Sequence, residues 1–472
     1  MLLQEIYHFA LKTLALRLAQ ATVIVIRVPL GRLKKAHPSF RQEITEAIAF
    51  RRHSEHLDSP LCPELHYLLM KILPISSSLT LGFCTGSLLL AEAPFKAQTI
   101  DPQIAIGYGL AVGDVDGDGD QDILLADKRD FIWYENPSWK KHLFHTFHQG
   151  DKRTQLRDNV CIAARDIDGD GKVEVAVGGN WNPGNTDSEE QSGSIHYLGS
   201  LGKVKPVQLP HDPTTHRMRW VHVGDKKYAL VVLPLHGRGN RGGEGKPVNV
   251  TAYFPPSNPS AGGSWKTAII NNELHKTHNF DSFDIYRDGS LDTVIIGGAE
   301  GARSVSLTEG KWQSRDLALP DMNGGAGEIR IGKFGKGEPA RQRNTFACIE
   351  PIHGNTVAVY EGTGGKGTGK TGWKRTVLDD SLSQGHALEY ADVLGTGSLQ
   401  VVAGWRNPNK EGKVGIKLYT PGKRQGTWIT HLIDDKIACE DLKVVDLNKD
   451  GKPDIIACGR STRNVVIYWN KG

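Results

Sequence analysis

The sequence predicts an all-β fold, a seven-bladed β-propeller over residues 94–472. The first observation is an acidic, glycine-rich turn between two apolar strands, clearest in Gly107–Asp127 (GYGLAVGDVDGDGDQDILLAD). The second is that this pattern recurs along the chain at steps of 49 to 62 residues. With Asp114 as the anchor, the equivalent positions are Asp166, His222, Asp284, Lys333, Asp392 and Asp446. Four strands in each unit of about 50 residues, repeated in tandem, are typical of propeller blades.

Each repeat is expected to contribute four strands in the same order. An inner strand precedes the anchor, as in 160–165, and a second strand follows the acidic turn, as in 122–126. The third strand is aromatic and alternating, as in Phe131–Tyr134. The fourth strand begins with tryptophan, as in Trp373–Leu378.

The seventh repeat ends at Gly472 without a fourth strand. The segment Phe95–Ile100 has the missing pattern. We therefore expect the N-terminal strand of the mature chain to complete the last blade and close the ring, because closure removes an exposed strand edge.

Residues 1–93 carry no repeat pattern. Met70-Lys71, an apolar run over 72–90 and the small residues Ala91-Glu92-Ala93 are typical of a signal peptide. We therefore predict a signal peptide over 70–93, cleavage near Ala93 and a secreted or periplasmic protein. Residues 1–69 are either an over-extended start or a disordered or helical extension.

The composition excludes some functions. The net charge is only +4 and no basic stripe is apparent, so we expect no nucleic-acid partner. The mature chain is also expected to be a monomer without membrane attachment. Four cysteines lie in the predicted propeller, and we expect them to be buried and reduced rather than paired in disulfides.

The position six residues before each anchor gathers reactive side chains. Because the acidic turn joins the first two strands, the start of the first strand lies on the opposite face of the propeller. This register contains Tyr108, Val160, His216, His278, Gly327, His386 and Glu440. We predict catalytic roles for Tyr108 and the three histidines. Glu440 and the adjacent Arg217 and Asn279 are predicted to bind substrate.

A second register lies where the second strand ends, on the same face. It contains Lys128, Asn180, His236, Gly298, Arg406 and Arg460, and blade five has a gap in it. His236 is a further catalytic candidate. Arginine and asparagine hold carboxylates and hydroxyls by forked hydrogen bonds, and exposed tryptophan suits the apolar face of a sugar. The predicted substrate-binding residues from these loops are Trp181, Arg238, Asn240, Trp405, Arg406 and Arg460.

The acidic turns resemble calcium loops in their ligand spacing. Three of them keep a nearly full set of oxygen ligands: Asp114, Asp116, Asp118 and Asp122; Asp166, Asp168, Asp170 and Glu174; and Asp446, Asn448, Asp450 and Asp454. We expect structural Ca²⁺ in at least one of them. The alternative is a set of Asx-rich turns that need no metal.

These repeats resemble FG-GAP or VCBS-type seven-bladed propellers. The histidine register and the His236–Gly243 loop are similar to secreted propeller polysaccharide lyases, including rhamnosyl-glucuronate lyases. That resemblance implies a carbon–oxygen lyase that cleaves an acidic, uronate-containing oligo- or polysaccharide by β-elimination at the channel mouth. Such a reaction needs cations on the carboxylate (Arg238 or Arg406), a base (His216 or His278) and an acid (Tyr108 or His236).

Two alternatives stay open. The chain is also similar to the propeller part of aldosulose dehydratases, which implies a metal-dependent sugar dehydratase. In that case a divalent ion such as Zn²⁺ would be bound by His216, His278 and His386. The other alternative is a non-catalytic propeller that binds glycan or protein through the same face and holds structural calcium.

Overall fold

The structure, a computed structural model, confirms an all-β, seven-bladed propeller. It describes residues 94–149, 155–202, 205–224, 226–261, 264–283, 292–322, 324–333, 345–363, 372–424 and 426–472. The predicted signal peptide and the segment before it lie outside these residues. The described residues form seven four-stranded sheets, and their one helical segment is the short 3-10 turn η2 (Pro259–Ala261). None of the described segments is a helix of the length and apolarity that a membrane span requires.

The blades follow one another in chain order. Blade one contains β2 (Gly109–Gly113), β3 (Asp122–Ala126), β4 (Asp130–Glu135) and β5 (Lys140–Thr146). Blade two contains β6 (Cys161–Arg165), β7 (Glu174–Gly178), β8 (Ile195–Gly199) and β9 (Val207–Leu209). Blade three contains β10 (Thr215–Gly224), β11 (Lys227–Pro234), β12 (Val250–Phe254) and β13 (Lys266–Asn271). Blade four contains β14 (Thr277–Phe283), β15 (Thr293–Gly298), β16 (Gly301–Thr308) and β17 (Lys311–Asp316).

The remaining blades keep the same order. Blade five contains β18 (Glu328–Ile331), β19 (Thr345–Glu350), β20 (Thr356–Gly362) and β21 (Trp373–Asp379). Blade six contains β22 (Gly385–Ala391), β23 (Gln400–Trp405), β24 (Gly415–Pro421) and β25 (Trp428–Asp434). Blade seven contains β26 (Cys439–Val445), β27 (Asp454–Gly459) and β28 (Val465–Asn470), with β1 (Phe95–Asp101) as its outer strand.

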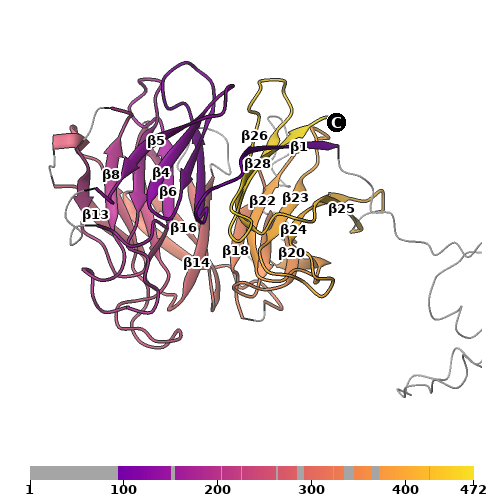
Figure 1. Cartoon of the computed structure of the whole chain (residues 1–472). Helices are drawn as coiled ribbons and strands as arrows, with labels where there is room; N and C mark the ends of the chain where they lie inside the picture. Colours follow the sequence, from indigo (N-terminus) through magenta and orange to yellow (C-terminus); the bar gives the residue numbers. More distant parts are fainter. Residues whose placement is uncertain are drawn as a thin grey trace, which may run out of the picture. The chain divides into compact units, whose positions relative to one another are not determined.

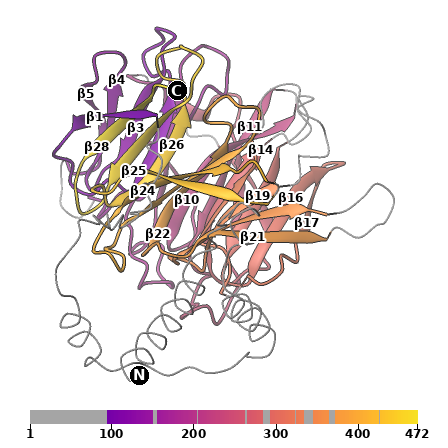
Figure 2. The same cartoon turned by 90° about the vertical axis from the view of Figure 1, so that its right-hand side faces the viewer.

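The seven inner strands contact one another in a closed cycle, from β2 through β6, β10, β14, β18 and β22 to β26 and back to β2. In blade seven β1 pairs antiparallel with β28, with Phe95 opposite Asn470. Figures 1 and 2 both show this meeting of the indigo start and the yellow end of the described chain. It stays a prediction that cleavage of the signal peptide makes β1 the N-terminal, ring-closing strand of the mature protein.

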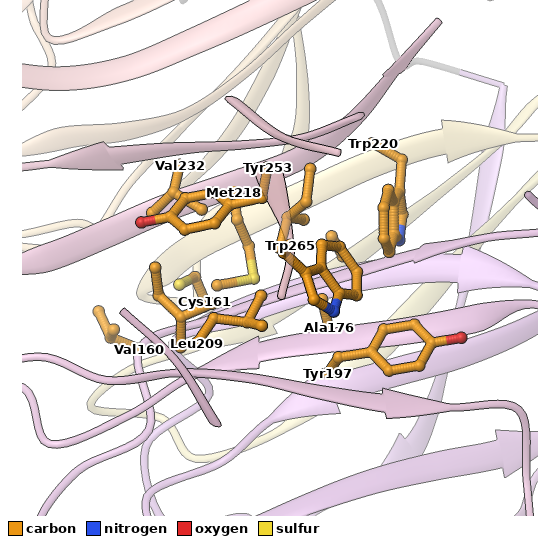
Figure 3. Close-up of a cluster of buried hydrophobic side chains, with 13 residues drawn as sticks. Val160, Cys161, Ala176, Tyr197, Leu209, Met218, Trp220, Val232, Tyr253 and Trp265 are labelled. Carbon is orange, nitrogen blue, oxygen red and sulfur yellow. The ribbon is translucent and has the colours of Figure 1, made fainter. Parts of the chain in front are cut away.

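The hydrophobic core is divided among the contacts between blades. Seven clusters of buried side chains each combine residues from two neighbouring blades. Figure 3 shows the cluster between blades two and three, where Met218 and Trp220 from β10 meet Cys161 and Ala176. All four described cysteines are buried and free, which confirms that prediction. The apolar contacts between blades thus position one inner strand against the next.

The acidic turns are tied to the blade by their last carboxylate. Asp122 accepts hydrogen bonds from the backbone N–H of Val115 (2.9 Å) and of Asn136 (2.8 Å). Asp454 does the same with Leu447 and Asn470 in blade seven. A buried carboxylate therefore joins the turn between the first two strands to the end of the third strand, which explains its place in the repeat.

A second repeated contact joins neighbouring blades. The third-strand tyrosine of one blade donates its hydroxyl to an aspartate at the end of the previous blade's fourth strand. The pairs are Tyr134 with Asp101 (2.8 Å), Tyr419 with Asp379 (2.8 Å) and Tyr468 with Asp434 (2.7 Å). We call these pairs the tyrosine latches.

The latch at Asp379 gives a test of this role. Burial acts to raise the pKa of Asp379, but hydrogen bonds from Lys417, Ser381 and Tyr419 hold that pKa below its usual value of 3.8. A depressed pKa contributes stability above the unfolded-state pKa, and this contribution is lost as the pH falls through the folded-state pKa. Asp379→Asn is therefore expected to lower the free energy of unfolding by about 1.5–3 kcal/mol at neutral pH.

Urea denaturation of the wild type and the variant at about pH 7 and about pH 3 measures this effect. The difference between the two proteins should shrink at the lower pH. A difference of equal size at both pH values would show that the carboxylate charge is not what stabilises the latch.

Candidate functional site

Four residues of the predicted histidine register occupy β-bulges. The pairing of the first two strands skips one residue at His216, His278, His386 and Glu440, in blades three, four, six and seven. A bulge bends the strand locally and redirects the extra side chain, and bulges are common beside active sites. The register found in the sequence is thus a set of equivalent bulges at one end of the inner strands.

Each bulge histidine donates a hydrogen bond to the backbone of another inner strand. His278 Nδ1 lies 2.7 Å from the carbonyl oxygen of Gly327 in blade five. His386 Nδ1 lies 2.7 Å from that of Glu440, and His216 Nδ1 lies 2.9 Å from that of His278. A carbonyl oxygen only accepts, so Nδ1 must carry the proton. In a neutral ring the lone pair is then on Nε2, the arrangement of a metal-binding histidine.

His278, His353 and His386 form a cluster whose ring nitrogens can converge on one ion. One nitrogen from each of the three rings lies within 4.8 Å of the others. His278 Nε2 and His353 Nε2 are 2.8 Å apart, and the His353 ring is stacked on His386 at 5.1 Å between centroids. This cluster contains His353 in the place where the sequence predicted His216. His216 instead stacks on Trp181 (4.9 Å) beside the cluster.

Gly327 explains how His353 reaches the cluster. Gly327 has no side chain in a register where blades three, four and six have histidine. A Cβ atom on Gly327 would lie 2.9 Å from the Cα of Ile352 and 3.0 Å from the backbone nitrogen of His353. His353 also has a φ of 55°, which is uncommon for a residue other than glycine. The loop that carries His353 thus uses the space that a side chain at Gly327 would fill.

The three clustered rings are held neutral. Burial lowers the pKa of His278. Burial, with the positive charges around it, lowers the pKa of His353 to about 2. Burial and then Arg406 hold the pKa of His386 well below its ordinary value. Neutral imidazoles are the form that binds divalent metals.

A buried carboxylate lies behind the cluster. Glu328 is fully buried, and its Oε1 is 3.2 Å from His278 Nδ1. Its Oε2 accepts from Asn279 Nδ2 (2.6 Å) and pairs with Arg330 (3.2 Å). Burial acts to raise the pKa of Glu328, but His278 and Arg330 hold it below its usual value, so the group stays ionised. Asn279, predicted to bind substrate, therefore holds this carboxylate instead.

Two of the predicted carboxylate-binding arginines already have a carboxylate partner. Arg406 Nη1 lies 2.9 Å from both oxygens of Glu440, and Arg460 Nη1 lies 2.9 Å from one of them. The Arg460 guanidinium also lies over the ring of Tyr108. Burial raises the pKa of Tyr108, so its hydroxyl stays protonated and can donate. These four residues form one hydrogen-bonded and stacked wall beside His386.

Arg217 differs from these arginines. Its Nη1 donates to the carbonyl oxygen of His216 (3.0 Å), and no carboxylate among the described residues forms an ion pair with it. Arg217 lines the central cavity together with Tyr108, Asn279 and Asp441. Its charge contributes to the lowered pKa of His278, His353 and His386. Arg217 is thus a cation near the histidine cluster, and no carboxylate of the described residues pairs with it.

The loop residues predicted to bind substrate have different positions. Trp405 is 1 % exposed and donates Nε1 to Lys413, so the expectation of an exposed stacking surface is wrong there. Arg238 pairs with Glu189 and Asp212. Asn240 is buried and donates to the carbonyls of Lys246 and His275. His236 is half-buried beside Asn240 in a surface hollow.

The acidic turns are at the opposite end of the inner strands from the histidines. In two turns, three carboxylates can converge within 4.8 Å: Asp114, Asp116 and Asp122, and Asp166, Asp168 and Glu174. At the exposed tips, the Asp118 and Asp170 carboxylates accept hydrogen bonds from the backbone N–H of Asp120 and of Lys172. The backbone N–H groups of Asp118 and Asp170 donate to Asp116 and Asp168. No such trio is found among the described residues of the Asp446–Asp454 turn. Most of the turn after Asp284 lies outside the described residues.

His353 and Glu328 were missed from the sequence. His353 fills the blade-five gap in the second register, where the loop Glu350–Asn355 has no counterpart of similar sequence. The available signal was that His353 lies in the one blade that could not be aligned in the second register, whose other positions carry mostly polar or charged side chains. The sequence did not indicate a role for Glu328, because its partners His278 and Arg330 occupy different positions of the repeat and no shared register connects them.

Comparison with known proteins agrees with this architecture. Residues 192–363 match the family described as aldos-2-ulose dehydratase, β-propeller domain, and residues 114–177 match an FG-GAP-like repeat. A curated relative, aldos-2-ulose dehydratase of Phanerodontia chrysosporium, is 22% identical over 302 residues, or 61% of this chain. The aligned part spans 31% of that relative's length.

Solved structures match this chain at low sequence identity. A BBS1N chain from a complex with ARL6DN has 13% identity and a TM-score of 0.48, and covers 80% of this chain and 97% of its own. Saccharomyces cerevisiae Sqt1 has 10% identity and a TM-score of 0.45, with coverage of 80% and 99%. Together, the repeats and the family matches identify this chain as a seven-bladed propeller with FG-GAP repeats, similar to the propeller domain of aldos-2-ulose dehydratase.

Proposed function

We propose that this protein is a metal-dependent carbon–oxygen lyase that removes water from a keto sugar. The observation that carries the proposal is the convergence of His278, His353 and His386 on one point at the end of the inner strands. Three neutral imidazoles that leave a coordination position open are typical of a catalytic zinc-type site. The similarity to aldos-2-ulose dehydratase supports a keto sugar as the substrate class.

The donor set fits a divalent cation. The bulge histidines His278 and His386 present unprotonated Nε2 atoms because their Nδ1 atoms donate to backbone carbonyls. The carbonyl oxygen of Gly327 accepts from His278 Nδ1 and so provides the outer hydrogen bond that metal-binding histidines usually have, and the carboxylate of Glu328 lies 3.2 Å from the same nitrogen. When bound, such a cation would act as a Lewis acid that polarises a substrate carbonyl.

The protein's own side chains then have separate tasks. His216 Nε2 is a base that can accept the proton from the carbon next to the carbonyl. The electron pair of that C–H bond forms the new C=C bond as the neighbouring C–O bond breaks. Tyr108 supplies a proton to the leaving oxygen, so water is released. Arg217 donates hydrogen bonds to the negative charge that develops on the carbonyl oxygen.

Cleavage of a uronate glycan is the second candidate. It requires cations that neutralise a substrate carboxylate. Arg406, Arg460 and Arg238 are all paired with protein carboxylates, whereas Arg217, which lines the central cavity, forms no ion pair among the described residues. The pairing lowers the support for this candidate relative to the dehydratase. Product analysis of a keto sugar and of a uronate glycan separates the two.

The remaining expectations are also proposals. We propose structural Ca²⁺ at the turns of blades one and two, where three carboxylates converge. Secretion after cleavage near Ala93, closure of the ring by the mature N-terminal strand and a monomeric state complete this proposal.

Replacement of His353 tests the metal site. His353→Ala removes one of three nitrogen ligands, and loss of an outer-shell partner alone weakens metal binding about 10–100-fold. We therefore expect Zn²⁺ affinity to fall by more than about 100-fold, with loss of dehydration of the 2-keto form of D-glucose. Competition with a chromophoric chelator measures the affinity, and ultraviolet absorbance of the unsaturated product measures activity.

His142→Ala is the matched control, because His142 lies on the outer strand of blade one and pairs with Glu135. It should leave both quantities unchanged. Wild-type zinc affinity in His353→Ala would exclude the proposed site. Normal affinity for zinc in the wild type without dehydration of any keto sugar would exclude the reaction but keep the metal site.

Gly327→Ala tests how the His353 loop is positioned. The new methyl group would meet backbone atoms of Ile352 and His353, which cannot rotate away. We expect a destabilisation of about 1–3 kcal/mol from overpacking and a clear loss of zinc affinity. Gly109→Ala is the control, because a Cβ there meets nothing nearer than 3.6 Å. Unchanged zinc affinity in a folded Gly327→Ala protein would contradict the role given to Gly327.

Calcium removal tests the acidic turns. Chelation is expected to lower the melting temperature of the wild type, and added Ca²⁺ should restore it, because an ion bound only to the folded state stabilises it. The calcium response should decrease in Asp116→Asn, which removes charge from the blade-one trio without touching the backbone bonds of Asp122. A melting temperature that is independent of Ca²⁺ would favour metal-free Asx turns.

A further inference from the structure

We propose that a surface hollow between the loops 183–191 and 236–242 is a second sugar subsite, which holds a neutral glycosyl unit attached to the sugar that reacts. We call this hollow the side pocket. The inference rests on the proposed function and extends it, because it makes the substrate a glycoside or oligosaccharide rather than a free monosaccharide.

The side pocket is linked to the histidine cluster through Trp181 and His216. Pro183, which lines it, follows Trp181 by two residues. The indole of Trp181 is stacked on His216 at 4.9 Å, and the His216 ring is 4.9 Å from that of His278. Both loops follow second strands, so they are on the same face of the propeller as the histidines. The proposed ligand would extend from the cluster past Trp181 to the side pocket.

Its size suits one or two sugar units. The hollow has a volume of about 580 Å³, within the usual range of about 300–1,000 Å³ for small-molecule sites. Its lining is polar and consists of loop residues, among them Asn185, Asp187, His236, Asn240 and Arg241.

Several of these side chains have unused hydrogen-bonding capacity. Within the described part of the chain, the Asp187 carboxylate and the Arg241 guanidinium form no hydrogen bond or ion pair. A sugar hydroxyl both donates and accepts, so it needs an acceptor and a donor within reach. The carboxylate and the guanidinium together meet that need.

The charge of the lining favours a neutral ligand. Asp187 and Arg241 are its charged residues, and their charges have opposite signs. The nearby Arg238 is compensated by Glu189 and Asp212. A uronate or phosphate group would therefore find no net positive charge here. Unmodified hydroxyl groups are matched better.

Hydrogen bonds within the two loops hold the backbone of the side pocket in place. Asn240 donates Nδ2 to the carbonyls of Lys246 and His275 and accepts from the backbone N–H of Gly243 (2.9 Å). On the facing loop Asn185 accepts from the backbone N–H of Ser188 (3.1 Å). These contacts fix the backbone of the two loops on which Asp187 and Arg241 line the hollow. A preformed wall lowers the ordering cost of binding.

Substrates of one and two units test the inference. The 2-keto forms of D-glucose and of gentiobiose are compared, because the (1→6) linkage of gentiobiose leaves the reacting carbons free. We expect a higher kcat/KM for the disaccharide in the wild type. In Arg241→Ala this advantage should fall by about tenfold, the loss expected for a hydrogen bond to a charged group, while conversion of the monosaccharide stays within about twofold.

Binding without reaction provides an independent measurement. Calorimetric titration of the wild type with unoxidised gentiobiose, maltose and cellobiose, each against D-glucose, needs no turnover. At least one disaccharide should bind more tightly than D-glucose, and Asp187→Asn or Arg241→Ala should remove that difference. Arg424→Ala is the matched control, because Arg424 is an exposed arginine on the hairpin between β24 and β25 at the far end of the blade.

The outcomes separate the two proposals. Conversion of the keto monosaccharide with no preference for any disaccharide, in rate or in binding, would overturn the side pocket and leave the proposed function standing. Disaccharide binding that depends on Arg241, without any dehydration, would support the subsite while refuting the reaction. An equal effect of Arg424→Ala would show that the change is not local and would also overturn the inference.

Discussion

The hydrogen bond from a bulge histidine to the backbone carbonyl of another inner strand is the interaction on which the candidate site depends. It fixes the proton on Nδ1, so that Nε2 of His278 and His386 is free to bind a cation. It also ties the direction of each ring to the position of a neighbouring blade. That position is set by the seven apolar clusters between blades, one of which is shown in Figure 3. The geometry of the proposed metal site therefore depends on the whole ring, because two of its three histidines lie on inner strands of different blades.

The arginines around this site show why residue type alone does not give a role. Arg406 and Arg460 are the residue type expected to bind a substrate carboxylate. Both instead pair with a carboxylate of the protein itself, Glu440. A buried carboxylate needs such compensation, since an unpaired charge at 2 % exposure is costly. The same holds for Arg330 and Glu328. Only a cation left over after this internal pairing is free for a substrate, and Arg217 meets that condition among the described residues.

The sequence was sufficient for the fold because each blade repeats the same local rules: an acidic turn closed by Asp122 or Asp454, an aromatic third strand and a tryptophan at the fourth. It also predicted that His278 and His386 lie near each other, because equivalent positions of a closed ring converge, and their ring centroids are 5.0 Å apart. It failed at His353, whose loop follows no repeat and needs the absence of a side chain at Gly327. It failed again at Trp405, because burial there depends on the strand β24 and the loop at Lys413 rather than on its own neighbours. Periodic positions are predictable from one chain, whereas contacts between unlike positions are not.

The two ends of the inner strands divide structural from chemical tasks. At the end with the acidic turns, the carboxylates largely accept hydrogen bonds from backbone N–H groups of their own blade, so these hydrogen bonds stabilise the fold. At the histidine end, ring nitrogens of His278 and His353 face each other at 2.8 Å, and among the described residues no carboxylate pairs with Arg217. An elimination next to a carbonyl needs this combination, an electrophile for the oxygen and a fixed cation for the charge that develops on it. An elimination next to a carboxylate would need at least one more uncommitted cation. The internal pairing of Arg406 and Arg460 with Glu440 is therefore the feature that favours a keto sugar over a uronate as the substrate of the proposed reaction.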